Sequence, residues 1–162
     1  MLTEKIQELL QEQINREFYS AYLYLDFSNH YNEVGLDGFG HWYYLQAKEE
    51  MEHARQFMDY LHKMDVKVQL KAIAQPDKKI KKVLDGVEMA LEHERFITAS
   101  IENIYAVAHE AKDYKTLDFI QGLVREQVEE EDSARILVDK VKAYGDDPSS
   151  LYLLNQELRG RA

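Results

Sequence analysis

Apolar residues recur every three or four positions in four long stretches of the chain, with polar residues between them. This spacing places the apolar side chains on one face of an α-helix. It predicts four helices, over residues 3–33, 37–64, 80–111 and 114–143. Only a few residues separate the first helix from the second, and the third from the fourth. Connections this short make consecutive helices antiparallel, so the pattern predicts two helical hairpins.

The connection between the second and third predicted helices is different. It covers about residues 65–79 and has no helical stripe. A segment of this length can cross from one end of a helical bundle to the other. Near the C-terminus, Asp147 followed by Pro148 is a helix-start signal, which predicts a short fifth helix over 148–159. The expected fold is all-α: a four-helix bundle with a long crossover and a short C-terminal helix, in one domain over residues 1–162.

Polar side chains interrupt the apolar row of every predicted bundle helix. The row of the first helix reads Leu10, Ile14, Glu17, Ala21, Tyr24 and Leu25. Across the four helices, the side chains in these rows that could bind a metal are Glu17, Glu50, His53, Glu94, Gln127 and Glu130. Two of these helices carry their pair at positions i and i+3, which brings both side chains within reach of one ion.

The distances of these residues from the turns place them at one height in the bundle. The turn glycine Gly35 is midway between Glu17 and His53. The turn of the second hairpin is likewise midway between Glu94 and Glu130. Residues equally far from the turn of an antiparallel hairpin lie level with each other, because the rise per residue is constant. The same interval of 77 residues separates three pairs: Glu17 and Glu94, Glu50 and Gln127, and His53 and Glu130.

A single glutamate in an apolar row is usually a boundary residue whose carboxylate reaches water. That interpretation does not explain six metal-competent residues at one height. Four carboxylates buried together would repel one another and would be unfavourable without counter-charge. Two divalent cations would supply four positive charges, with His53 and Gln127 as neutral ligands. Carboxylate and imidazole ligands suit Fe(II), Mn(II) or Zn(II), and helical bundles hold pairs of iron ions in this way.

Composition narrows the function further. The chain has 162 residues, with only 7 Gly and 2 Pro. It has no Cys, which excludes disulfides, iron–sulfur clusters, thiolate metal sites and a cysteine nucleophile. The net charge of −10 repels nucleic acid and anionic membranes and attracts cations. The opening residues lack a secretion signal and no apolar run is long enough to cross a membrane, so we expect a cytoplasmic protein without nucleic-acid or membrane partners.

Four motifs resemble those of bacterial non-haem ferritins. They are Asn15-Arg16-Glu17 with Tyr19-Ser20-Ala21, Glu49-Glu50-Met51-Glu52-His53-Ala54, His93-Glu94, and Glu126-Gln127-Val128-Glu129-Glu130-Glu131. The resemblance covers nearly the whole chain. It implies an iron storage protein with ferroxidase activity, which oxidises Fe(II) with dioxygen or hydrogen peroxide at a two-iron site. It also implies that ferric mineral is deposited inside a cage of 24 subunits.

The resemblance also implies which side chains hold iron. The first iron is matched by Glu17, Glu50 and His53, with Glu50 bridging, and the second by Glu94 and Glu130, with Gln127 beside it. Three further acidic residues, Glu49, Glu126 and Glu129, match a third iron position that shares Glu130. The alternative for these three is a solvated acidic face. Tyr24 matches the family's tyrosine near the iron pair, and its alternative is an ordinary core residue.

Two departures separate the chain from related families. Bacterioferritins have Glu-x-x-His in the fourth helix, where this chain has Gln127-Val128-Glu129-Glu130. Met51 matches the haem-ligating methionine of bacterioferritins, but non-haem ferritins often have methionine there too, and the resemblance argues against haem. The remaining histidines are expected at the surface or its boundary: His30, His41, His62, His93 and His109.

Two functions from other classes remain open on the sequence. One is a helical scaffold or passive metal buffer without rapid oxidation. The other is a di-iron oxidase that never forms a cage. The short fifth helix bears on the second, because a helix of this length is marginal alone. We expect its apolar side, with Leu151, Leu153 and Leu154, to be buried against neighbouring subunits.

Overall fold

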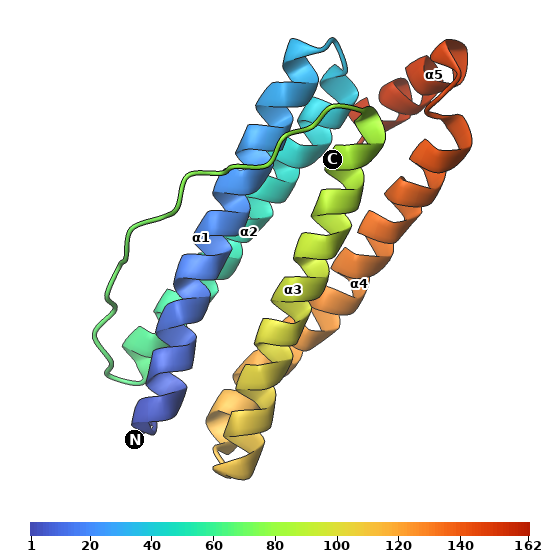
Figure 1. Ribbon diagram of the computed structural model, residues 1–162. Coiled ribbons are helices and arrows are strands. Elements are labelled where there is room, and N and C mark those ends of the chain that lie inside the picture. Colours follow the sequence, from blue (N-terminus) through green and yellow to red (C-terminus); the bar gives the residue numbers. More distant parts are fainter.

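The computed structural model describes all 162 residues and contains five helices and no strand (Figure 1). The helices are α1 (Glu4–Glu33), α2 (Asp37–Lys63), α3 (Val83–Glu110), α4 (Tyr114–Tyr144) and α5 (Pro148–Arg159). This confirms the predicted all-α fold. The start of α3 differs from the prediction by a few residues. The carboxylate of Asp85 accepts the backbone N–H of Lys81 at 3.0 Å and of Lys82 at 2.8 Å, and this cap fixes the start of the helix.

The two hairpins are closed by residues with left-handed backbone conformations. Gly35, between α1 and α2, has φ 81°. Lys112, between α3 and α4, has φ 54°. Asp113 then caps α4 by accepting the N–H of Thr116 at 3.2 Å. Figure 1 shows the α1–α2 and α3–α4 hairpins side by side, as the short predicted connections require.

The crossover between α2 and α3 is an extended strap that runs along the outside of α1 (Figure 1). Side chains of α1 hold it in place. Gln11 donates to the carbonyl of Lys67 at 2.7 Å and accepts the N–H of Gln69 at 3.0 Å. Asn15 donates to the carbonyl of Ala72 at 3.0 Å. These hydrogen bonds supply partners to a backbone that has no secondary structure of its own.

The core consists of two apolar clusters, one in each half of the bundle's length. The cluster near the α1–α2 turn is built around Tyr24, Phe27, Tyr31, Phe39 and Tyr43. The other is built around Ile6, Leu10, Phe57, Ile101 and Ile120. The buried polar residues of the predicted rows lie between them. Leu25, expected in the apolar row, is 38% exposed, because one helical step past Tyr24 turns its side chain away from the core.

The short helix α5 packs on its own subunit. Leu154 and Leu158 are buried in the core cluster near the α1–α2 turn. Asn155 accepts the N–H of Gly38 at 2.8 Å and of Phe39 at 3.3 Å, and so caps α2 from a distant part of the chain. The expectation that this helix buries its apolar side against neighbours is therefore wrong for Leu154, while Leu153 is 67% exposed.

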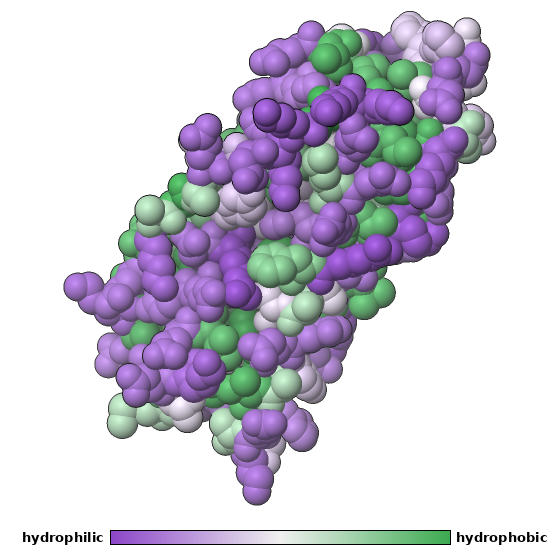
Figure 2. Space-filling view, viewed as in Figure 1, coloured by the Kyte–Doolittle hydropathy of each residue, from purple (hydrophilic) through white to green (hydrophobic).

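The outer surface shown in Figure 2 is mostly hydrophilic, with separate apolar patches between the charged side chains. None of the five helices combines the length and the apolar character that crossing a bilayer requires. The cytoplasmic location expected from the sequence stays a prediction.

Candidate metal centre

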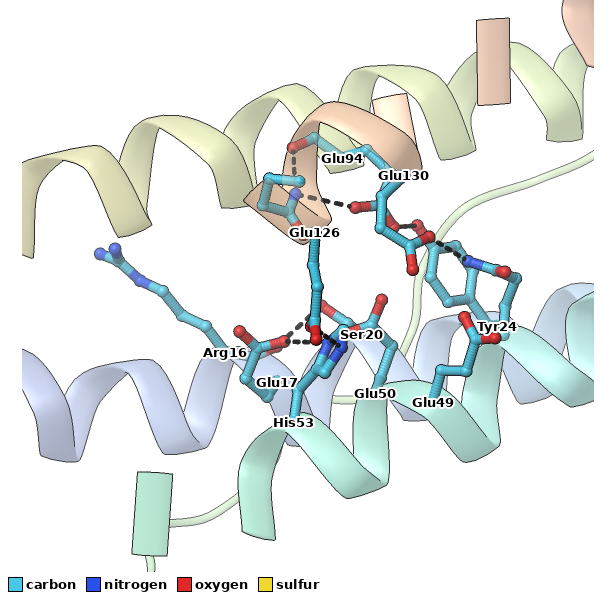
Figure 3. A network of polar contacts seen from close by, with 12 residues as sticks. Arg16, Glu17, Ser20, Tyr24, Glu49, Glu50, His53, Glu94, Glu126 and Glu130 are labelled. Atoms are coloured by element: carbon cyan, nitrogen blue, oxygen red, sulfur yellow. Dashed lines mark hydrogen bonds and ion pairs between the residues drawn. The ribbon is translucent and has the colours of Figure 1, made fainter. Parts of the chain in front are cut away.

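The centre of the bundle holds a layer of buried ionisable side chains (Figure 3). Glu17 comes from α1, and Glu50 and His53 come from successive turns of α2. The Nδ1 atom of His53 lies 3.1 Å from Glu50 Oε2 and 3.9 Å from Glu17 Oε2. One ligand atom from each of the three residues lies within 4.8 Å of the others, so the group could hold a metal ion.

Two carboxylate oxygens in this group have no hydrogen-bond donor. They are Glu17 Oε2 and Glu50 Oε1, and both residues are at most 1% exposed. Buried polar atoms almost always have a partner, so two orphaned oxygens beside an imidazole need an explanation. A cation between them would supply the missing partner for both oxygens, and carboxylate oxygen with imidazole nitrogen is a donor set suited to Fe(II), Mn(II) or Zn(II).

The residues from α3 and α4 are arranged differently, because their carboxylates do have donors. Tyr24 donates its hydroxyl to Glu94 Oε1 at 2.5 Å, and Gln127 Nε2 donates to Glu94 Oε2 at 3.1 Å. Gln46 Nε2 donates to Glu130 Oε2 at 3.0 Å. These contacts connect α1 with α3 and α2 with α4, so they also tie the two hairpins together at the height of the layer.

Burial makes the four central carboxylates poor acids. Removal from water raises the pKa of Glu17 and Glu50 well above the usual value, and the neighbouring carboxylates raise it further. Burial likewise raises the pKa of Glu94, against the lowering effect of its hydrogen bond from Tyr24. Burial and the charge of Glu94 raise the pKa of Glu130 to about 7. Without cations, the layer therefore takes up protons that a metal ion would displace.

His53 has the opposite electrostatic character. Burial lowers its pKa, but the hydrogen bond to Glu126 and the surrounding carboxylates outweigh burial and raise the pKa to about 9. The bond joins His53 Nε2 to Glu126 Oε2 at 3.0 Å. It also lowers the pKa of Glu126. The imidazole is thus a cation that partly balances the acidic layer, and it must lose a proton to become a metal ligand.

A chain of hydrogen bonds holds Glu17 from behind. Gln13, which is fully buried, donates its amide to Glu17 Oε1 at 2.8 Å. The carbonyl oxygen of Gln13 accepts from Ser100, which in turn accepts from the guanidinium of Arg16. Arginine can only donate, so every donor and acceptor in this chain is fixed. This series of hydrogen bonds supplies a donor to Glu17 Oε1 and leaves Glu17 Oε2 facing the other side chains of the layer.

The three acidic residues matched to a third iron lie in three different settings. Glu126 alone contacts the layer. Glu49 forms an ion pair with Arg161 at 3.0 Å. Glu129 is exposed and lines a separate surface hollow with Arg95. The structure therefore brings the six central residues and Tyr24 together, with Glu126 in contact with them, whereas Glu49 and Glu129 lie apart. The common role of these three acidic residues stays a prediction.

The residues that support the layer were not predicted from the sequence. Gln13 and Gln46 each lie one helical turn, four residues, before Glu17 and Glu50 respectively. Both glutamines are buried in rows that are otherwise apolar, which is the signal that could have identified them. Ser100 gave no such signal, because a serine inside a helix commonly bonds to its own backbone.

His93 lies at the boundary of the core, as expected, next to the layer. Its Nε2 atom is 2.7 Å from Ser20 Oγ, and its ring meets that of Tyr24 edge-on. Burial, followed by the charge of Lys78, lowers the pKa of His93 to about 4, so the ring is neutral at physiological pH. The other four histidines, His30, His41, His62 and His109, are partly or fully exposed.

Comparison with known proteins agrees with this geometry. Residues 7–143 match the family described as "Ferritin-like domain". The chain is 41% identical to a bacterial non-heme ferritin of Campylobacter jejuni, covering 100% of this chain and 97% of that protein. It is 38% identical to a bacterial non-heme ferritin of Bacteroides fragilis, covering 99% of this chain and 100% of the relative. Among solved structures it resembles an open pore ferritin of Archaeoglobus fulgidus, with a TM-score of 0.98, 38% identity and complete coverage of both chains.

Proposed function

Because this chain belongs to the ferritin-like domain family, we propose that it oxidises Fe(II) at the buried layer and stores the ferric product. The observation that carries the proposal is the pair of orphaned, buried oxygens on Glu17 and Glu50 beside His53. A bundle kept only for its shape would gain stability from apolar residues at these positions. Among the metals that this set of donor atoms suits, the family relationship supports iron as the substrate.

In this proposal six residues bind two Fe(II) ions. The ligands are Glu17, Glu50 and His53 at the first iron, and Glu94, Glu130 and Gln127 at the second. Four ionised carboxylates bring four negative charges, which two Fe(II) ions balance. Glu50 carries the bridging role, because its side chain lies in the middle of the layer and the charge of Glu94 acts directly on it.

The oxidation itself transfers one electron from each Fe(II). Two Fe(II), one dioxygen and two protons give two Fe(III) and one hydrogen peroxide, or two Fe(II), one hydrogen peroxide and two protons give two Fe(III) and two waters. The protein holds both ions at fixed positions among carboxylates of which Glu17, Glu50 and Glu94 are at most 1% exposed. His53 and the protonated carboxylates release protons when Fe(II) binds, since their pKa values are raised.

Two further roles follow from the family relationship. Glu49, Glu126 and Glu129 are assigned to a third iron position, through which iron leaves the pair. Of these, Glu126 is best supported, because it already touches a ligand of the pair at 3.0 Å. Tyr24 orients Glu94 through its short hydrogen bond of 2.5 Å.

For storage, the subunits must form a closed homo-oligomer. A shell of 24 subunits of 19.1 kDa would have a mass of about 458 kDa. One similar solved structure is an engineered closed form of the Archaeoglobus fulgidus ferritin, and another is an open pore ferritin of the same organism. Apolar side chains remain exposed on the outer side of α5, with Tyr152 at 61% and Leu153 at 67%. These side chains suit contact with further copies of the chain.

Three measurements test the proposal and its rivals together. Anaerobic titration counts the Fe(II) bound per subunit, and stopped-flow absorbance after mixing with oxygen measures oxidation. We expect two tightly bound Fe(II) ions and a fast first oxidation phase. Binding without a fast phase would support a passive metal buffer instead. Analytical ultracentrifugation at neutral pH then separates a cage of about 458 kDa from an oxidase that stays a monomer or dimer.

A further inference from the structure

Arg161, which follows α5, is fixed against α2 by four contacts. Its guanidinium lies 3.0 Å from Glu49 Oε1 and donates to the carbonyl of Trp42 at 3.1 Å. The same guanidinium stacks over the Trp42 ring, 4.2 Å from its centroid. Its backbone carbonyl accepts from His41 Nε2 at 2.7 Å. Only 18% of the Arg161 side chain is exposed.

Such order is unusual for a residue outside secondary structure. Residues beyond a helix generally move freely unless specific contacts hold them, and fixing an arginine side chain costs rotamer entropy. Here α5 ends at Arg159 and Gly160 follows as its cap, which directs Arg161 back onto α2. The contacts combine an ion pair, a hydrogen bond and a stacked cation–π interaction, which together outweigh that entropy.

Glu49, the ion-pair partner, belongs electrostatically to the metal centre. It directly precedes Glu50 on α2, and Figure 3 shows its side chain directed from α2 toward α4. Besides burial and the charge of Glu94, the charge of Glu49 raises the pKa of both Glu50 and Glu130. Its place next to Glu50 in the sequence and its direction toward α4 put the Glu49 carboxylate at the edge of the layer, where the third position of the proposed function lies.

We propose that Arg161 is a built-in counter-cation for Glu49, which competes with a metal cation for that carboxylate and so limits occupation of the third position. This inference rests on the proposed function, because it assumes the iron pair and the third position beside it. A guanidinium and a divalent cation on one carboxylate repel each other. Arg161 paired with Glu49 therefore weakens cation binding there, and the cation binds more tightly when Arg161 moves away. A hollow of about 300 Å³, lined by Trp42, Leu158 and Arg161 itself, gives the displaced side chain room.

The test is calorimetric titration of the assembled, iron-free protein with Zn(II), which binds without redox chemistry. We expect two tight binding steps in wild type and in Arg161→Ala. A third, weaker step should be about tenfold tighter in Arg161→Ala, the size expected for loss of one partly buried charged hydrogen bond. Arg159→Ala is the matched control, because it removes the same charge from the same end of α5. Arg159 pairs with Asp37, at 2.7 Å, and not with Glu49.

Two more variants sharpen the test. Arg161→Lys keeps the charge but loses the two-pronged contact and the stacking on Trp42, so its third step should lie between wild type and Arg161→Ala. Adding Glu49→Gln to Arg161→Ala should remove the gain in affinity. Ultracentrifugation checks that each variant assembles. If Arg161→Ala does not assemble, Arg161→Lys is compared with wild type instead.

The outcomes separate this inference from the proposed function. A third step that is equally strong in Arg161→Ala and Arg159→Ala, or absent from both, overturns the role of Arg161. Loss of the two tight steps in wild-type protein overturns the iron pair itself. Faster multi-turnover iron oxidation in Arg161→Ala, with an unchanged first turnover, would support the same competition in the working protein.

Discussion

The two halves of the metal centre use the same residue types but differ in their hydrogen bonding. In the half on α1 and α2, Glu17 and Glu50 each have a buried oxygen without any donor. In the half on α3 and α4, both oxygens of Glu94 accept hydrogen bonds, and Glu130 accepts one from Gln46. The first half therefore has two carboxylate oxygens without a hydrogen-bond donor, while the carboxylates of the second half already have donors.

This difference indicates an order of binding. A cation entering between Glu17 and Glu50 satisfies two unpartnered oxygens and breaks no carboxylate–amide bond, so we expect it to bind first. A cation at Glu94 must share oxygens that already have donors. A carboxylate oxygen has a second lone pair, so the donors orient the group without blocking it. The second site should consequently be weaker and more sensitive to the residues that hold Glu94.

Removal of a ligand from the first half should have the largest effect. We expect Glu50→Ala or His53→Ala to slow the fast oxidation phase by more than about 100-fold, because losing a ligand should exceed the effect of losing a supporting residue. The iron-free variant Glu50→Ala should be no less stable than wild type, since it removes a buried carboxylate among like charges. Stopped-flow absorbance and thermal unfolding measure the two effects.

The control for that experiment is Glu52→Ala. Glu52 is exposed on the outer side of α2, so its removal deletes a glutamate from the same helix without touching the layer. It should retain wild-type oxidation. Fast oxidation at the wild-type rate in both Glu50→Ala and His53→Ala would refute the assignment of the first half.

A smaller effect is expected when a donor is removed from the second half. Tyr24→Phe removes the 2.5 Å hydrogen bond to Glu94 and keeps the ring. We expect the second Zn(II) to bind about tenfold more weakly, with the first step unchanged, because supporting bonds orient a ligand. Tyr43→Phe is the control, since the Tyr43 ring packs against that of Tyr24 and its hydroxyl makes no carboxylate hydrogen bond. An equal loss in both steps would remove the distinction between the halves.

The sequence predicted the parts of this centre that depend on helical geometry. Helical period and turn positions place Glu17 level with His53, and the structure puts their side chains 3.9 Å apart. The contacts of α5 were not predictable in the same way. The caps that Asn155 provides to α2, and the ion pair of Arg161 with Glu49, join residues more than 100 positions apart. No period connects such residues, because their proximity follows from how the finished helices pack.

The pH dependence of metal binding provides a third prediction, with a smaller effect. The pKa of Glu130 is raised to about 7 from its value of 4.5 in the unfolded chain. Its contribution to the stability of the folded protein is therefore complete below pH 4.5 and is lost as pH rises through 7. The pKa of His53 is raised to about 9, so its contribution is complete below 6.5 and is lost as pH rises through 9. Both shifts make the iron-free protein less stable with rising pH.

Cations replace these protons, so the stabilisation by Zn(II) should grow with pH. We expect the increase in Tm on adding Zn(II) to be about twofold larger at pH 8.5 than at pH 5.5. Differential scanning calorimetry of the two forms measures it. Glu130→Gln, which cannot ionise, should flatten the dependence between pH 5 and 7. A gain in Tm that falls with pH would contradict the assigned protonation of the layer.

The smallest effect is expected outside the layer, where Glu126 and Glu129 can be compared directly. The two residues are one turn apart on α4, but only Glu126 touches His53, at 3.0 Å. Glu126→Ala should lower the pKa of His53, because the hydrogen bond to Glu126 is the largest influence that raises this pKa. The pH profile of the first turnover should therefore change.

Glu129→Ala should leave the first turnover unchanged and slow later turnovers by about twofold, since removing one solvated carboxylate changes a cation's energy only slightly. Repeated additions of Fe(II) to each variant in the stopped-flow instrument distinguish the cases. If later turnovers are also unchanged in Glu129→Ala, this glutamate belongs to the solvated face of α4, and iron leaves the pair through Glu126 and Glu49 alone.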